Sequence, residues 1–147
     1  MKYLVYLLPA LAGITITTQA GVNSQLRVAI NNPWMAAFIS FLVGTCFLGL
    51  ILLFTRQPIP SVSQLKSIEL YKFTGGLLGT FFVTVIILTV QKIGAANVFA
   101  LVIASQLFMA MLYDHLGLFG LPQSPVNWVK ILGALLLIAG AYLVNKK

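Results

Sequence analysis

The strongest constraint on the fold of this chain is a series of long apolar segments that fill most of its 147 residues. A helix needs about 20 mostly apolar residues to cross a bilayer, whereas a membrane β-barrel shows short segments in which apolar and polar residues alternate. Continuous apolar runs lie at residues 3–22, 34–54, 73–90, 96–116 and 128–144. The sequence therefore predicts an all-α integral membrane protein with five transmembrane helices in a single membrane domain, residues 1–147.

Charged residues are too scarce for a soluble globular domain. They make up 7% of the chain, against about a quarter in ordinary globular domains. The nine basic residues outnumber the two acidic ones, but they are spread over segment ends and loops, as charges excluded from lipid are. A nucleic-acid-binding surface would instead gather them into one patch. The predicted partner is therefore the lipid bilayer, and no nucleic acid is expected.

The chain does not contain the residue groups that enzymes and metal sites require. Cys46 is its only cysteine and His115 its only histidine, so the sequence indicates neither a disulfide framework nor a metal site. No paired carboxylates, nucleophile–base pair or phosphate-binding loop stand in a polar setting. We therefore expect no catalytic residues, no cofactor and no enzymatic activity.

Polar residues follow one face of the first segment and continue past its end. At 100° per residue, five of them fall within about 160° of arc: Thr15, Thr18, Gln19, Asn23 and Gln25. Each needs a hydrogen-bond partner once it leaves water, so this face cannot be turned toward lipid. Three interpretations follow: hydrogen bonding between helices, the lining of a transport site, or a signal peptide cleaved after Ala20. The polar face continues beyond that cleavage point, which favours a retained helix.

The fourth segment holds a second group of polar residues. Gln106 falls near the middle of the span, where an unpaired carboxamide is costly. We predict a substrate cavity lined by the following residues: Thr15, Gln19, Asn23, Gln106, Trp34 and Tyr113. For Trp34 and Tyr113 the alternative is an interface anchor or core packing. Asp114, at the end of this segment, is a candidate for coupling transport to an ion, and its alternative role is to set the helix end.

Two glycine pairs predict close helix packing. Gly75 and Gly79 form a Gly-x-x-x-Gly pair, and Gly133 and Gly140 lie seven residues apart on one face of the last segment. Small residues let two helix backbones approach closely in a membrane. We expect both pairs to lie on helix packing surfaces, the second between subunits.

The basic residues leave the orientation in the membrane open. With five helices, one side carries Lys2, Arg56, Lys66, Lys72 and Lys130, and the other carries Arg27, Lys92, Lys146 and Lys147. The difference, 5 − 4 = 1, is too small to fix the orientation through the excess of Lys and Arg. Either the chain inserts both ways and forms an antiparallel homodimer with an inverted repeat, or its longest loop orients every copy the same way.

Three stretches carry a resemblance to a known family. They are Gln19-Ala-Gly-Val-Asn-Ser-Gln-Leu-Arg27, Gly75-Gly-Leu-Leu-Gly-Thr-Phe-Phe-Val83, and Gln106-Leu107 followed by Asp114-His-Leu-Gly-Leu-Phe-Gly120. Together they resemble the YdcZ-type inner-membrane exporters, a five-helix branch of the drug/metabolite transporter superfamily. The resemblance covers essentially the whole chain. It implies a multi-pass protein of the bacterial inner membrane that forms half of a ten-helix bundle, as a homodimer or with a homologous partner subunit.

The predicted function is secondary transport or export of a small polar or amphipathic solute by alternating access at a dimer cavity. Small multidrug resistance transporters of the same superfamily exchange protons for cationic drugs at a carboxylate in their first helix. The corresponding segment here has Thr15, Gln19 and Asn23 but no acid, which argues against that mechanism unless Asp114 reaches inward. The alternative function is a non-transporting membrane scaffold or a subunit of a larger membrane complex.

Overall fold

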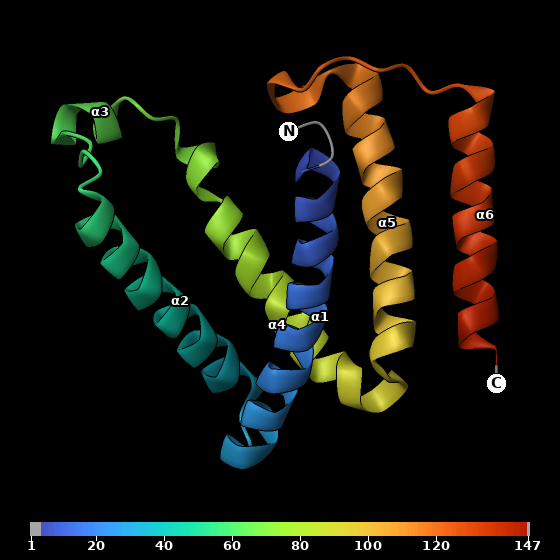
Figure 1. Cartoon of the computed structure of the whole chain (residues 1–147), viewed down its shortest axis with the longest axis horizontal. Helices are drawn as coiled ribbons and strands as arrows, with labels where there is room; N and C mark the ends of the chain where they lie inside the picture. The colour runs from blue at the N-terminus through green and yellow to red at the C-terminus, as the bar shows by residue number, and fades with distance from the viewer. Residues whose placement is uncertain (1–3, 147) are drawn as a thin grey trace. The chain divides into compact units, whose positions relative to one another are not determined.

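The computed structural model describes residues 4–146, and every regular element in this range is helical (Figure 1). The long helices are α1 (Leu4–Ile30), α2 (Pro33–Thr55), α4 (Gly75–Ile93), α5 (Ala95–Leu116) and α6 (Trp128–Asn145). Short helices lie in the connections: α3 (Val62–Lys66), η1 (Leu70–Phe73) and η2 (Leu118–Gly120). The predicted all-α membrane fold is confirmed. The predicted start of the first helix, residue 3, and two charges of the orientation count, Lys2 and Lys147, lie outside the described residues.

Within the described part of the chain, four helices are long and apolar enough to cross a membrane: α2, α4 together with η1, α5 and α6. α1 has 27 residues, which is more than the roughly 20 that a span needs. It is less apolar than the other four because polar residues occupy its second half. α1 also continues to Ile30, past the predicted end at residue 22. The helix predicted to be the first span is therefore the one that carries the polar face.

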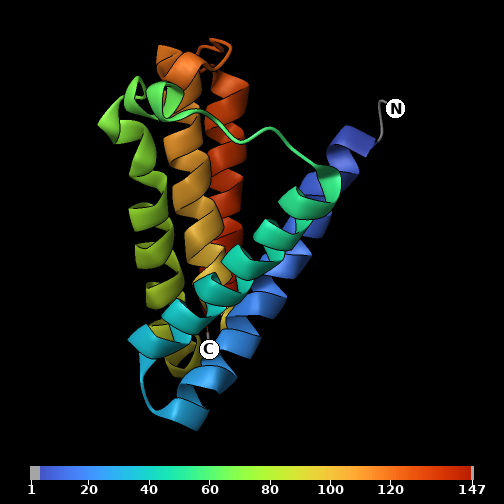
Figure 2. The ribbon, with the colours of Figure 1, turned by 90° about the vertical axis from the view of Figure 1, so that its left-hand side faces the viewer.

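The chain divides into two compact units, Met1–Lys92 and Ile93–Lys147. In the first unit, α1 and α2 form a hairpin of antiparallel helices (Figure 2). The turn passes through Asn31, whose φ of 50° lies in the left-handed region that asparagine tolerates. Asn32 then caps α2, because its Oδ1 accepts hydrogen bonds from the N–H groups of Trp34 (3.0 Å) and Met35 (3.1 Å).

A small apolar core connects the hairpin to α4. Ala36 of α2 and Ile87 of α4 are 0% exposed, and Ala37 beside them is 2% exposed. Leu26 of α1 and Val83 of α4 pack against this cluster. The two alanines leave room for the larger Ile87 side chain, as small residues do between membrane helices. The core of the first unit therefore lies where the second half of α1, the start of α2 and the second half of α4 meet.

In the second unit, α5 and α6 lie side by side (Figure 1). α5 ends at Leu116, and Gly117 caps it with a φ of 63°, which suits glycine, and an N–H that donates to Tyr113 O. α6 begins after Asn127, which caps the helix by accepting a hydrogen bond from the N–H of Lys130 (2.9 Å). Both ends of the intervening loop are thus defined by local hydrogen bonds.

The loop itself is held to both helices. The N–H of Val126 donates to His115 Nδ1 on α5 at 3.2 Å. On α6, Lys130 Nζ donates to Ser124 O (2.8 Å), Ser124 Oγ (2.7 Å) and Pro125 O (3.2 Å). All three ammonium hydrogens therefore have acceptors in this loop.

Candidate functional site

The outer part of the α1 polar face satisfies its hydroxyl donors within the helix. Thr15 Oγ1 donates to Ala12 O (2.8 Å), and Thr18 Oγ1 donates to Ile14 O (2.9 Å). Bonds of this kind to a carbonyl one turn earlier let threonine enter a membrane helix without an external partner. Thr15, a predicted cavity residue, therefore needs no other helix for its donor, and its oxygen remains able to accept.

Gln19 lies in an open hollow on α1. The hollow is formed with Ala12, Thr15 and Ile16, and Gln19 is exposed on the surface of the chain. A carboxamide has two donors and one acceptor, and leaving them unpaired in lipid is costly. In the membrane, Gln19 therefore needs either another polar surface or water against it.

The polar face enters the interior one turn after Gln19. Asn23 and Ser24 are each 4% exposed. The Nδ2 group of Asn23 has no hydrogen-bond partner within the described residues. A buried donor without a partner costs about 1–3 kcal/mol. Asn23, predicted to line the cavity, is thus a buried amide with unused donor capacity.

Long polar side chains connect this part of α1 to α4. Arg27 is half-buried and donates from Nη1 to Ile87 O at 3.2 Å, and Gln91 donates from Nε2 to Ser24 O at 3.3 Å. Thr84 of α4 is 2% exposed, and its Oγ1 has no partner in the part of the chain that the structure describes. We call these residues the polar seam: Asn23, Ser24 and Arg27 of α1 with Thr84, Ile87 and Gln91 of α4.

The α4 side of the polar seam was not predicted from the sequence, although a signal for it exists. Thr80, Thr84 and Gln91 fall within about 40° of arc on the α4 helical wheel. A polar stripe this narrow in an apolar helix indicates a buried contact. Arg27 gave a weaker signal, because a basic residue in the last turn of a helix is favourable by itself.

The other predicted cavity residues lie on other helices. Trp34 stands in the first turn of α2 and is 66% exposed. Gln106 and Tyr113 are on α5, in the second unit. The Tyr113 ring meets that of Phe119 edge to face, with centroids 5.2 Å apart and an interplanar angle of 89°. A single cavity that joins these residues to the α1 polar face stays a prediction.

Asp114, the candidate for coupling, is partly exposed near the end of α5. Its backbone carbonyl accepts a hydrogen bond from the N–H of Ser124 at 2.8 Å, which adds to the order of the loop. The other acid of the chain, Glu69, forms an ion pair with Lys72 at 3.4 Å. Among the described residues, no three His, Cys, Asp or Glu side chains gather into a group that could hold a metal ion. A coupling role for Asp114 stays a prediction.

The predicted packing glycines have different surroundings. A Cβ placed on Gly79 would lie 3.8 Å from Cζ of Phe41 on α2, an ordinary van der Waals contact. Nothing among the described residues lies within 4 Å of a Cβ placed on Gly75, Gly133 or Gly140. The glycine face of α6 is therefore open within the chain, and its role in dimer packing stays a prediction.

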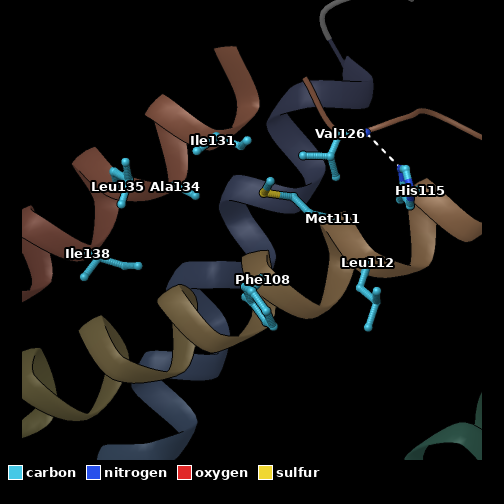
Figure 3. Close-up of a pocket in the computed structure, with 9 residues that line it drawn as sticks. All are labelled: Phe108, Met111, Leu112, His115, Val126, Ile131, Ala134, Leu135 and Ile138. Carbon is cyan, nitrogen blue, oxygen red and sulfur yellow. Dashed lines mark hydrogen bonds between the residues drawn. The ribbon is translucent and has the colours of Figure 1, made fainter. Parts of the chain in front are cut away.

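The second unit also contains an apolar groove of about 320 Å³ between α5 and α6 (Figure 3). Its walls are mainly apolar side chains, among them Phe108, Leu112 and Leu135. His115 lies at one end of the groove, and its Nδ1 accepts the hydrogen bond from Val126 (Figure 3). These walls suit lipid or an apolar helix, in contrast to the hydrogen-bonding groups of the polar seam.

Comparison with known proteins finds a family model and a relative that each cover nearly the whole chain. The family model described as "Putative inner membrane exporter, YdcZ" matches residues 4–143. "Inner membrane protein YdcZ" of Escherichia coli (strain K12) is 30% identical over 136 residues, which are 92% of this chain and 91% of the relative. No solved structure matches this chain. The matched range includes every residue of the polar seam.

Proposed function

We propose that this chain, which belongs to the family described as "Putative inner membrane exporter, YdcZ", exports a small polar or amphipathic solute by alternating access. It is a multi-pass helical protein of the inner membrane. Polar groups inside membrane spans are rare and commonly mark a substrate or ion path. The residues proposed for that path are Thr15, Gln19 and Asn23 of α1, with Gln106 of α5 as a further member.

The observation that carries this proposal is the change of burial along the polar face of α1. Thr15 and Gln19 are exposed, whereas Asn23, one turn beyond Gln19, is 4% exposed and has an unpartnered Nδ2. Hydrogen-bonding groups therefore continue from the surface of the chain into its interior. Alternating access requires such a route, opened to one side of the membrane at a time.

The proposed working unit is a homodimer, and the arrangement to be tested first is the antiparallel one. Two chains of five long helices give ten, and opposite insertion relates them as an inverted repeat. The open face at Gly133 and Gly140 is the surface proposed for this contact, because nothing described lies within 4 Å of a Cβ placed there. In such a dimer, Trp34 and Tyr113 are candidates for apolar or cation–π contacts with the solute.

The first test measures water access to the polar face. In a Cys46→Ala background, single cysteines replace Thr15, Gln19 or Asn23 in membrane vesicles, and a charged, water-soluble thiol reagent is added. A cysteine at Ile14 is the matched control, because this residue is 64% exposed but lies outside the polar arc. Reaction at Gln19 and not at Ile14 is the expected result. If the reagent labels none of the three polar positions, the result favours the non-transporting scaffold.

The second test measures export directly. Proteoliposomes are loaded with a bacterial metabolite extract. The solutes they release are compared with those released by protein-free liposomes loaded with the same extract. The double variant Gln19→Ala, Asn23→Ala should abolish the difference while expression and dimerisation stay unchanged. Unchanged release by the double variant removes these residues from the path.

A third test addresses the antiparallel arrangement. Two reporters, one active only in the cytoplasm and one only outside it, are fused in turn to the C-terminus. Activity of both is expected of a chain that inserts in two orientations. Activity of one alone excludes the antiparallel homodimer and directs the search to a parallel assembly or to a partner subunit.

A further inference from the structure

We infer that the polar seam between α1 and α4 binds an anionic group, a carboxylate or a phosphate, and that the exported solute carries it. The inference rests on the proposed export function and names the chemical class of its substrate. It is drawn from the surroundings of one charged side chain and from the two orphaned polar atoms of the polar seam.

The charged side chain is Arg27. Its guanidinium is half-buried, and Nη1 donates to the carbonyl of Ile87 at 3.2 Å. A guanidinium has five N–H donors and stays charged at any physiological pH. The first unit contains a single acid, Glu69, and its carboxylate already pairs with Lys72 at 3.4 Å. The first unit therefore supplies no free carboxylate to compensate Arg27.

The orphaned polar atoms are next to this charge along the helices. Asn23 and Arg27 are four residues apart, which places their side chains on one face of α1. Thr84 and Ile87 are three residues apart on one face of α4, and Ile87 supplies the carbonyl that Arg27 reaches. Asn23 Nδ2 and Thr84 Oγ1 are both buried without a partner among the described residues.

The two orphaned atoms of the polar seam and the remaining N–H groups of Arg27 are all able to donate hydrogen bonds. Asn23 Nδ2 and the remaining guanidinium N–H groups only donate, and the Thr84 hydroxyl is able to donate. The carbonyl of Ser24 is already engaged by Gln91 Nε2, and that of Ile87 by Arg27. Several donors beside a fixed positive charge match a carboxylate or phosphate, whose oxygens only accept. Arg27 would repel a cation. A neutral solute would leave the positive charge of Arg27 uncompensated.

The phosphate of a lipid headgroup has the same chemistry as the anionic group of a solute. The experiment therefore compares soluble and lipid anions on the full chain. The melting temperature is measured in a neutral detergent with benzoate, benzamide or benzamidine at constant ionic strength. These probes share one ring and differ in charge. We expect benzoate alone to raise the melting temperature, increasingly with concentration. Stabilisation by benzamidine, or by none of the three probes, overturns the inference.

Variants locate the effect. Arg27→Gln should lose the benzoate shift, while Lys92→Gln should keep it, because Lys92 is an exposed cation in the last turn of α4. Asn23→Asp places a carboxylate four residues from Arg27. It should raise the melting temperature without benzoate and abolish the further rise, which keeps the inference testable where Arg27→Gln fails to fold. A benzoate shift that survives in either Arg27→Gln or Asn23→Asp overturns the inference.

Nanodiscs test whether the anionic group in the polar seam belongs to a lipid headgroup. Discs of phosphatidylcholine alone are compared with discs that also contain phosphatidylglycerol, each with and without benzoate. A benzoate shift in both supports a solute site. Stabilisation by phosphatidylglycerol alone, with no response to benzoate, assigns the site to lipid and overturns the inference about the solute.

Failure of the inference differs from failure of the export function. Release of only cationic or neutral solutes from proteoliposomes overturns the anion site and leaves export intact. Benzoate stabilisation without release of any solute overturns export and leaves an anion-binding polar seam.

Discussion

Replacing Thr84 with valine should stabilise the protein, although it removes a polar group from a buried site. Thr84 is 2% exposed, and its Oγ1 has no hydrogen-bond partner among the described residues. Valine has nearly the same shape but exchanges the hydroxyl for a methyl group. An unsatisfied buried hydroxyl costs about 1–3 kcal/mol. The lower end applies in a membrane, where hydrogen bonds between helices average only about 0.6 kcal/mol. We therefore expect Thr84→Val to raise the free energy of unfolding by about 1 kcal/mol.

The matched control is Thr89→Val on the same helix. Thr89 Oγ1 donates to Val85 O at 2.7 Å, so its hydroxyl is already satisfied and valine there should change the free energy by no more than about 0.5 kcal/mol. The assay is reversible unfolding in mixed micelles with increasing SDS, followed by circular dichroism. A gain of about 1 kcal/mol is a roughly fivefold shift of the unfolding equilibrium, which this titration resolves.

A loss of stability in Thr84→Val would contradict this prediction. If Thr84→Val lowers the free energy of unfolding while Thr89→Val leaves it unchanged, the Thr84 hydroxyl has a partner in the folded protein and is not an orphaned group. If Thr84→Val is stabilising as expected, it should also weaken the benzoate shift, because one donor of the polar seam is lost.

Three further predictions concern the cap, the core and the glycine face. Asn32→Ala should lower the free energy of unfolding by about 1 kcal/mol in the SDS titration, since α2 loses its cap, and Asn32→Ser should restore most of it. Ile87→Ala should lower it by about 2 kcal/mol or more through lost packing, while alanine at Ile93, which is 44% exposed, should have little effect. Gly140→Leu should weaken dimerisation in crosslinking assays without changing the fold of the protomer, whereas Tyr142→Leu, on the other side of α6, should not. Equal dimer yields for the two variants would remove the glycine face from the interface.

The helices were predictable because their signal is long and strong. Apolar runs of about 20 residues in a chain with 7% charged residues have few alternatives to a helical membrane fold. The end of α1 was harder to predict. Asn23, Ser24 and Arg27 resemble the polar exit of a span, whereas the helix continues to Ile30. Asn23 and Ser24 are buried inside the helix instead, and α1 ends where Asn31 turns the chain with a φ of 50°.

The candidate site was predictable on only one of its two helices. The α1 polar face is wide and regular, so Asn23 could be selected from it. Thr84 lies in a helix of high overall hydropathy, and from the sequence its hydroxyl is expected to donate to a backbone carbonyl one turn earlier. The hydroxyls of Thr80 and Thr89 do so. Which threonine is left without a partner depends on burial between helices, and spacing along one helix does not contain that information.

The hydrogen bonds of the loop before α6 have a practical consequence for proteolysis. Gly and Pro residues make residues 117–127 look like a flexible target, but Lys130 Nζ is held by Ser124 and Pro125. A protease must draw a segment of extended backbone into its cleft, and this segment is not free to leave its helices. The connection after α2 has fewer such ties, and Ile59 within it is 92% exposed. Residues 117–127 contain no Lys or Arg, and the nearest site, Lys130, lies inside α6. Trypsin added to one side of sealed vesicles should cut beside Arg56 well before Lys130. The fraction of chains cut would then measure how many copies present that connection to the outside.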